Sequence, residues 1–435
     1  MVMIRRTWAT EKPNPDAIPR PGNGRWIVAS ALVFLLAFLA SRFQTTPANF
    51  NPDESRWISR AYFVAALRDP SGPAWQDSYR MRGQPPVGSY VTGLGLLAQG
   101  RDLTTNPPWN FTWKWEKNLA RGNRPTPEDL DAARRTSAIL IGFTAVVVLG
   151  TVRMVTNALG AMTAAVVFAV HPFNGYIGSL ATADACFMLF IAIAALAAGR
   201  LAARPGPLPA VALGIALGLG AGAKISPLGT AVLLGVFGGV LLLIDLVRTR
   251  TIPRDWLGWG LVLTPLLAGG VFIVVYPYLW PDPIGRTLNL LRFRTREMSL
   301  QASDWPVMAV PTRTEAFRRI GVNFHERYSL LTPLRRLGWQ PPAIELAIAA
   351  AGGVVWLADA VRAGLRSPTM LVLLTLVAQV AVTVAGMRSE FDRYHVPMAL
   401  LGCMAIGVAV GAIGDAVERR RGSPNSDAII RSEPA

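Results

Sequence analysis

The chain of 435 residues is apolar and basic: 51% of its residues are hydrophobic, only 16% are charged, and the formal net charge is +16. A soluble protein of this size carries about a quarter charged residues, so the composition excludes an ordinary soluble enzyme. The positive charge does not indicate nucleic acid, because the basic residues flank apolar runs instead of gathering on one module. The sequence predicts an all-α polytopic membrane protein.

Ten apolar runs approach the roughly 20 residues that cross a bilayer. They are residues 26–43, 136–155, 160–179, 184–200, 208–223, 228–247, 256–276, 343–361, 369–386 and 396–415. Arginines cluster in alternate short connections, near Arg153, Arg200, Arg248, Arg362 and Arg419, and by the positive-inside rule these connections are cytoplasmic. This topology places both termini in the cytoplasm and the protein in the plasma (inner) membrane.

The same topology divides the chain into parts. Residues 1–25 and 416–435 are predicted to be disordered cytoplasmic tails, and 26–415 the transmembrane domain, with two long external segments, 44–133 and 277–342. The apolar patch 84–99 is short and contains glycines, so it is expected to lie at the interface without crossing.

The external segment 277–342 is rich in arginine. Ten arginines, including Arg286 and Arg294, stand there against five acidic residues. Long external loops translocate regardless of charge, so the topology is not affected. The excess predicts an anionic partner, which is either lipid headgroups or a bound phosphate ester.

Two adjacent carboxylates, Asp53 and Glu54, follow the first apolar run at the start of a predicted amphipathic helix. Asn51 can cap this helix and Pro52 can take its first position. The simple explanation is that the carboxylates complement the helix dipole and pair with nearby arginines. The alternative is a catalytic role, because ionisable groups at a membrane edge are costly to keep there.

Further ionisable residues stand at the external ends of the predicted spans. They are Asp184, Lys224, Asp282, Arg393 and His395. Each has a simpler explanation, such as a helix cap for Asp184 or contact with lipid headgroups for Lys224. Their convergence on the side that carries Asp53 nevertheless favours a functional site.

The sequence has no nucleotide-binding signature: it lacks both a P-loop and a strand-framed Gly-x-Gly-x-x-Gly. Its three histidines are scattered, without zinc-ligand spacing. A transferase without a nucleotide pocket would take its donor as a lipid-linked phosphate ester. It would need a carboxylate to accept the proton of the acceptor hydroxyl and cations to stabilise the departing phosphate. Asp53 can supply the first, and Lys224 or the arginine-rich segment the second.

Taken in order, these motifs resemble the GT-C membrane glycosyltransferases, in particular the protein O-mannosyltransferases and lipid A aminoarabinose transferases. The matching motifs are Asp53-Glu54, Gln84-Pro85-Pro86-Val87-Gly88, Arg135-Thr136-Ser137-Ala138, Asp184, Lys224, Tyr276 to Pro283, and Arg393-Tyr394-His395-Val396-Pro397. The resemblance runs from about residue 26 to 415. Each motif is short, and their order along the predicted topology makes the resemblance specific.

The resemblance implies a GT-C bundle with extracytoplasmic juxtamembrane helices and a polyprenyl-phosphate sugar donor. The acceptor would be a hydroxyl of a glycan, lipid or protein. Asp53 would be the catalytic base for inverting attack at the sugar C1, and Glu54 would position the acceptor or stabilise the site. The expected substrate-binding residues are Gln84, Asp184, Lys224, Arg286, Arg393, Tyr394 and His395.

One departure concerns Gln84, where members of the family often have His or Lys. It leaves open both the acceptor class and a divalent cation at that position, and no cofactor is required by the sequence. Two other classes of function remain: a transporter or flippase of an anionic lipid-linked saccharide, and a non-catalytic assembly subunit. A transporter would show paired broken spans and charges near the bilayer midplane.

Overall fold

The computed structural model describes residues 24–44, 50–251, 253–338 and 340–421. Apart from one isolated bridge between Ala309 and Ser389, these residues form helices and their connections, with no strand among them. The predicted tails lie mostly outside the described residues. Where they overlap them, Gly24 and Arg25 open the first helix and residues 416–421 continue the last one, so both terminal helices are longer than predicted.

Within the described residues, eight helices are long and apolar enough to cross a membrane, so this is an integral membrane protein. They are α1 (Gly24–Phe43), α7 (Pro127–Val152), α10 (Asp184–Ala203), α12 (Pro227–Thr249), α13 (Trp256–Val274), α17 (Pro341–Ala363), α18 (Pro368–Gly386) and α19 (Val396–Arg421). Helices α8 (Ala158–Val170) and α9 (Pro172–Ser179) meet at a bend of 52° and together make a ninth candidate span. Helix α11 (Pro207–Ala223) has 17 apolar residues and packs between α10 and α13. Each of the ten predicted runs is therefore helical, although one is broken and one is short.

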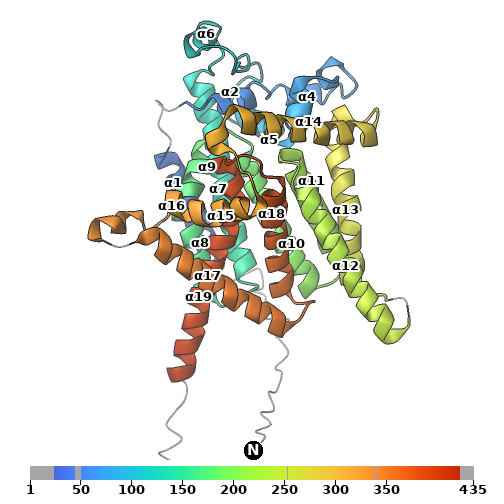
Figure 1. Ribbon diagram of the computed structural model, residues 1–435, viewed down its shortest axis with the longest axis vertical. Coiled ribbons are helices and arrows are strands. Elements are labelled where there is room, and N and C mark those ends of the chain that lie inside the picture. The colour runs from blue at the N-terminus through green and yellow to red at the C-terminus, as the bar shows by residue number, and fades with distance from the viewer. Residues whose placement is uncertain (1–23, 45–49, 252, 339, 422–435) are drawn as a thin grey trace, which may run out of the picture.

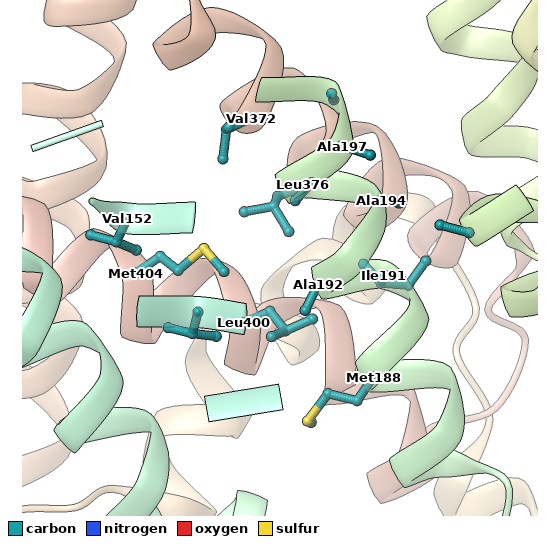
Figure 2. Close-up of a cluster of buried hydrophobic side chains, with 14 of the residues drawn as sticks. Val152, Met188, Ile191, Ala192, Ala194, Ala197, Val372, Leu376, Leu400 and Met404 are labelled. Carbon is teal, nitrogen blue, oxygen red and sulfur yellow. The ribbon is translucent and has the colours of Figure 1, made fainter. Parts of the chain in front are cut away.

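The centre of the bundle is α10. In α10, 67% of the most apolar stretch of 18 residues is buried inside the protein, whereas in α1 the buried share of such a stretch is 22%. Figure 2 shows the cluster that α10 forms with α7, α18 and α19, in which Ala192 of α10 lies beside Leu400 of α19. Small residues such as Ala192 line α10 here, and small side chains let neighbouring helices approach closely in a membrane.

Short helices cover one end of this bundle. From the first external segment they are α2 (Pro52–Ile58), α3 (Phe63–Ala66), η2 (Pro73–Trp75), α4 (Tyr79–Gly83), α5 (Val87–Ala98) and α6 (Trp115–Ala120). From the second they are η3 (Pro277–Leu279), η4 (Pro306–Met308), α15 (Arg313–Arg318), η5 (Arg319–Asn323), α16 (Phe324–Tyr328) and η6 (Thr332–Leu337), and η7 (Asp392–His395) precedes α19. The second segment also contains one long helix, α14 (Pro283–Asp304), of 22 residues. In Figure 1, α2, α4, α6 and α14 lie at the top, opposite the ends of α12 and α19 that carry the predicted cytoplasmic arginines.

Helix α5 carries the patch that was expected not to cross the membrane. Its 12 residues extend over only about 18 Å, which is too short for a bilayer. Its glycines bring it into close contact with its neighbours: a Cβ added at Gly88 would lie 2.5 Å from the Cβ of Ala183, and one at Gly95 would lie 2.0 Å from Thr136. The helix is therefore packed against the start of α10 and against α7.

A buried carboxylate in α17 fastens the second external segment to the bundle. Glu345 is 2% exposed, and its Oε1 lies 2.8 Å from His325 Nδ1 of α16 and 3.3 Å from His171 Nε2 at the α8–α9 bend. Its Oε2 accepts hydrogen bonds from Ser329 Oγ at 2.8 Å and from the backbone N–H of Leu330. Because all these groups are polar and buried, each needs the others as partners.

Candidate active site

Helix α2 begins with the predicted cap. The Asn51 side chain accepts the N–H of Asp53, the carboxylate of Glu54 accepts the N–H of Asn51 at 3.0 Å, and Pro52 takes the first helical position. This reciprocal pair satisfies two backbone donors that a helix start leaves unpaired. The cap fixes the first turn of α2, and from this turn the carboxylates of Asp53 and Glu54 point in different directions.

Glu54 points into the protein and is 0% exposed. Arg134 of α7 donates to it twice, from Nε and Nη2, both at 2.7 Å, and the N–H of Ala181 donates to the same carboxylate at 2.9 Å. Glu54 thus ties α2 to α7 and to the α9–α10 connection. It does not contact either of the cavities described below, so of its two expected roles the geometry leaves the stabilisation of the site.

The arginine that meets Glu54 is Arg134 of α7, 80 residues along the chain, and not one of the nearby arginines of the simpler explanation. Arg135 is half exposed and pairs with Asp131 on the outside of α7. The helical period predicts that Arg134 faces the protein interior, because it lies four residues from both Leu130 and Ala138, which are buried.

Asp53 points away from the protein interior, and its side chain is 38% exposed. Its Oδ2 lies 3.1 Å from Nη1 of Arg393 in η7, and Oδ1 has no protein partner among the described residues. Asp53 stands on the wall of an open cavity of about 700 Å³. The walls come from α2, α4, the connection 107–123, α14 and η7. A carboxylate in this position is accessible to a ligand that enters from the aqueous side.

A second, smaller cavity of about 160 Å³ adjoins the first, since Trp57, Gln84, Arg294 and Arg393 line both. It lies where α10 begins and α11 ends, beneath α14, and it is walled by side chains of α14 and α18. The apolar part of its lining includes Phe187, Leu290, Met298, Val382 and Pro397. Its polar part includes three cations, Lys224, Arg294 and Arg393.

The cation at the end of α11 is held by a buried acid. Lys224 forms an ion pair with Asp184, which is 6% exposed and also accepts a hydrogen bond from Thr182 Oγ1 at 2.7 Å. Burial lowers the pKa of Lys224, and the negative charge of Asp184 opposes that shift. The pairing holds the ammonium group of Lys224 in the wall of the smaller cavity, and a cation there can bind a phosphate.

Comparison with known proteins agrees on the fold. No family model matches the sequence, and no curated protein does. The structure is similar to the archaeal oligosaccharyltransferase AglB from Archaeoglobus fulgidus, solved in complex with an inhibitory peptide and a dolichol-phosphate, with a TM-score of 0.54 at 11% identity over 92% of this chain and 52% of that chain. The apo form of the Archaeoglobus fulgidus oligosaccharyltransferase gives a TM-score of 0.54 at 12% identity, over 95% of this chain and 53% of that chain. The chain has the GT-C fold.

Two further solved structures with this fold are less similar. ArnT from Cupriavidus metallidurans bound to undecaprenyl phosphate gives a TM-score of 0.48 at 16% identity, over 92% of this chain and 64% of that chain. The S. cerevisiae protein O-mannosyltransferase complex bound to the sugar donor gives 0.44 at 15% identity, over 60% and 34%. The chain spans about half the length of the oligosaccharyltransferase, so the similarity concerns the GT-C bundle and its short covering helices.

Most of the expected site residues meet at the two cavities of this GT-C bundle. Asp53, Gln84 and Arg393 line the larger cavity, and Asp184, Lys224 and Tyr394 line the smaller one, together with Gln84 and Arg393. Among the described residues no three His, Cys, Asp or Glu side chains form a group that could hold a metal ion.

Arg286 corrects the sequence prediction, because it lines neither cavity. It donates to the carbonyl oxygen of Tyr278, and its guanidinium lies 4.9 Å from the Tyr278 ring, so it fastens the start of α14 to η3. Arg294 stands at the cavities instead, about 12 Å farther along the helix. It donates to the carbonyl of Gly83 at 2.9 Å and pairs with Glu297. The composition of residues 277–342 indicated an arginine-rich segment, but it did not distinguish the arginine that lines the cavities from the others.

His395 is the second correction. It is 0% exposed, away from both cavities, and packs among aromatic rings such as Phe324, whose centroid lies 5.8 Å away. Its Nε2 is 3.4 Å from Oε1 of Glu390. A short 3₁₀ turn changes direction from one residue to the next, which is why Arg393 and Tyr394 reach the cavities and His395 does not.

Glu390 provides a pH prediction. Burial raises its pKa, but His395 and the positive charge of Arg327 outweigh burial, and the net pKa lies below the ordinary value. A carboxylate with a depressed folded-state pKa stabilises the protein above its unfolded pKa, about 4.3, and this contribution is lost as the pH falls through the folded value. We expect thermal stability to decrease in that acidic range and Glu390→Gln to make the decrease shallower. An unchanged pH profile in the variant, measured by melting temperature in detergent, would assign the loss to other carboxylates.

Proposed function

We propose that this protein is an extracytoplasmic inverting glycosyltransferase that moves a sugar from a polyprenyl-phosphate donor to a hydroxyl acceptor. The observation that carries the proposal is the position of Asp53. Its carboxylate faces an open cavity that adjoins a smaller one with an apolar wall and a cluster of cations. The GT-C fold supports it, since AglB was solved with dolichol-phosphate.

In the proposed reaction the acceptor hydroxyl enters the larger cavity and approaches Oδ1 of Asp53. Asp53 takes the hydroxyl proton while the acceptor oxygen forms a bond to the sugar C1 from the face opposite the phosphate. The bond between C1 and the phosphate oxygen breaks with its electron pair, so the configuration at C1 inverts. Polyprenyl phosphate leaves as an anion, stabilised by Lys224, Arg294 and Arg393.

The donor is assigned to the smaller cavity because its wall combines the two chemistries of a lipid phosphate. Leu290 and Met298 of α14 and Val382 of α18 offer apolar surface at the edge of the bundle, suited to an isoprenyl chain within membrane lipids. Lys224 supplies positive charge for the phosphate. The side of the membrane follows from the positive-inside rule, since the arginine-rich short connections lie at the opposite end of the helices.

The proposal is tested with purified protein in nanodiscs and a panel of labelled polyprenyl-phosphate sugars. With an extract of cell-envelope glycans as acceptor, we expect label to move from lipid to glycan and free polyprenyl phosphate to accumulate. Transfer from a nucleotide sugar instead of the lipid would contradict the proposal. Movement of intact lipid-linked sugar across liposomes, without transfer, would establish the flippase. The geometry does not favour a flippase, because the described helices contain one bent pair and not two related ones.

Lys224 gives a prediction on donor binding. Lys224→Met removes a cation from the smaller cavity, so we expect KM for the lipid donor to rise about tenfold with a smaller change in kcat. Because this substitution also leaves Asp184 buried without its partner, the double variant Lys224→Met/Asp184→Asn serves to remove both charges. It should regain thermal stability while KM stays high. Lys114→Met, at an exposed lysine outside both cavities, is the matched control. A KM that recovers with stability would assign Lys224 to the fold alone.

A further inference from the structure

The larger cavity holds more positive charge than its acids balance. Six arginines line it, together with Asp53 and Glu297 as its acids. The two acids are already paired with Arg393 and Arg294. The remaining arginines have no carboxylate partner in the described part of the chain; they are Arg56, Arg60, Arg80 and Arg121.

These four arginines come from three separate pieces of chain that line one space. Arg56 lies in the last turn of α2, Arg60 just after it, Arg80 in α4, and Arg121 at the end of α6. None of them lines the smaller cavity. Like charges that share a wall repel one another, and an anion bound between them would relieve that repulsion.

Arg60 shows this most clearly. It is 6% exposed, its Nη2 donates to the carbonyl of Gln84 at 2.6 Å, and its buried Nε has no partner. Loss of hydration lowers its pKa to about 10. The rings of Trp57 and Phe63 lie 5.4 and 5.3 Å from its guanidinium, a favourable contact that does not replace a hydrogen-bond acceptor. A buried donor without an acceptor is costly and marks a place where a ligand atom can bind.

We infer that the acceptor that enters this cavity is an anionic saccharide, one that carries phosphate or carboxylate groups near the hydroxyl that receives the sugar. The inference rests on the proposed function, since it takes the larger cavity as the acceptor side. Guanidinium groups match both anions in geometry. A saccharide fits better than an acidic peptide, because amide and aromatic side chains, among them Asn110, Gln301 and Trp113, line the same cavity and offer partners for hydroxyls and ring faces.

The test is equilibrium binding to the full chain in nanodiscs of zwitterionic lipid. The labelled probes are a short oligogalacturonide for carboxylate, a phosphomannan fragment for phosphate, a neutral malto-oligosaccharide of similar length, and oligoglutamate as the acidic peptide. We expect at least one anionic saccharide to bind about tenfold more tightly than the neutral one, and the preferred probe identifies the anion. Equal binding of the neutral saccharide, or tighter binding of oligoglutamate, overturns the inference.

Variants locate the binding. Arg80→Gln/Arg121→Gln removes two of the four unpaired arginines and should weaken anionic binding about tenfold while leaving neutral binding unchanged. Arg248→Gln/Arg254→Gln, two exposed arginines at the other end of the helices, is the control and should bind like wild type. An equal loss in the control means non-specific attraction and overturns the inference. Binding of undecaprenyl phosphate should be unaffected by Arg80→Gln/Arg121→Gln, and its loss would reassign the cavity to the donor.

Because these experiments measure binding without turnover, they separate this inference from the proposed reaction. Retained anionic binding together with absent sugar transfer would overturn the proposed function alone. Sugar transfer to a neutral acceptor, with no preference for anions, would overturn the inference alone.

Discussion

Asp53→Asn is expected to reduce sugar transfer by about 10²–10⁴-fold, the range that positioned acid–base groups contribute. Asparagine preserves the shape of the side chain and the cap that begins at Asn51, but it cannot take the proton of the acceptor hydroxyl. The measurement is the initial rate of transfer from a polyprenyl-phosphate sugar at saturating donor and acceptor. Asp304→Asn, at an exposed aspartate of α14 that lines neither cavity, is the matched control and should retain the wild-type rate.

Asp53→Asn also removes the negative charge that faces Arg393. A lower transfer rate could therefore come from the missing base or from a displaced Arg393, and kinetics distinguish the two. A missing base lowers kcat, whereas a displaced Arg393 raises KM for the donor. Stability should change by no more than about 1 kcal/mol, because the Asp53 side chain is more than a third exposed and exposed ion pairs contribute little. A normal kcat with a raised KM would remove Asp53 as the base and leave it a role in holding Arg393.

Arg134→Leu should have the largest effect on stability, about 3–5 kcal/mol, because it leaves the Glu54 carboxylate buried without its cation. Glu54 is 0% exposed and receives two hydrogen bonds from the Arg134 guanidinium. The loss is measured by reversible denaturation in mixed micelles, or as a lower melting temperature where unfolding is irreversible.

The neighbouring residue supplies the control. Arg135→Leu breaks a half-exposed pair with Asp131 and should cost about 1 kcal/mol or less. Adding Glu54→Gln to Arg134→Leu removes the stranded charge and should recover part of the stability. If Arg134→Leu and Arg135→Leu destabilise equally, the buried ion pair is not what fixes α2 to the bundle, and the orientation of Asp53 must depend on other contacts.

The spans and the cap of α2 could be read from the chain because their causes are local. A run of apolar residues is helical in a membrane whatever surrounds it, since every backbone polar group must be satisfied internally. The cap at Asn51 depends on residues within one turn. For the same reason Asp53, Asp184, Lys224 and Arg393 could be proposed as site residues, because each is an ionisable group at the end of an apolar run.

The sequence did not distinguish Arg294 from Arg286, or Arg134 from Arg135. Within each pair the residue types are identical, and only the direction in which the backbone presents the side chain differs. Arg294 reaches the cavities because α14 passes over them at that point, while Arg286 is held by Tyr278 at the start of the helix. Residues 107–123 form a wall of the larger cavity, although they carry none of the motifs on which the resemblance rests.

By itself the sequence determined that this is a helical membrane protein with an acidic pair and several cations at one end of its spans, because hydrophobicity, charge position and capping act over a few residues at a time. Tertiary structure decided which carboxylate is buried and which faces a cavity, and it brought arginines from five separate pieces of chain into one wall. Those outcomes depend on how α2, α4, α6 and α14 pack over the bundle, and contacts between residues far apart in the chain leave no local pattern in the sequence.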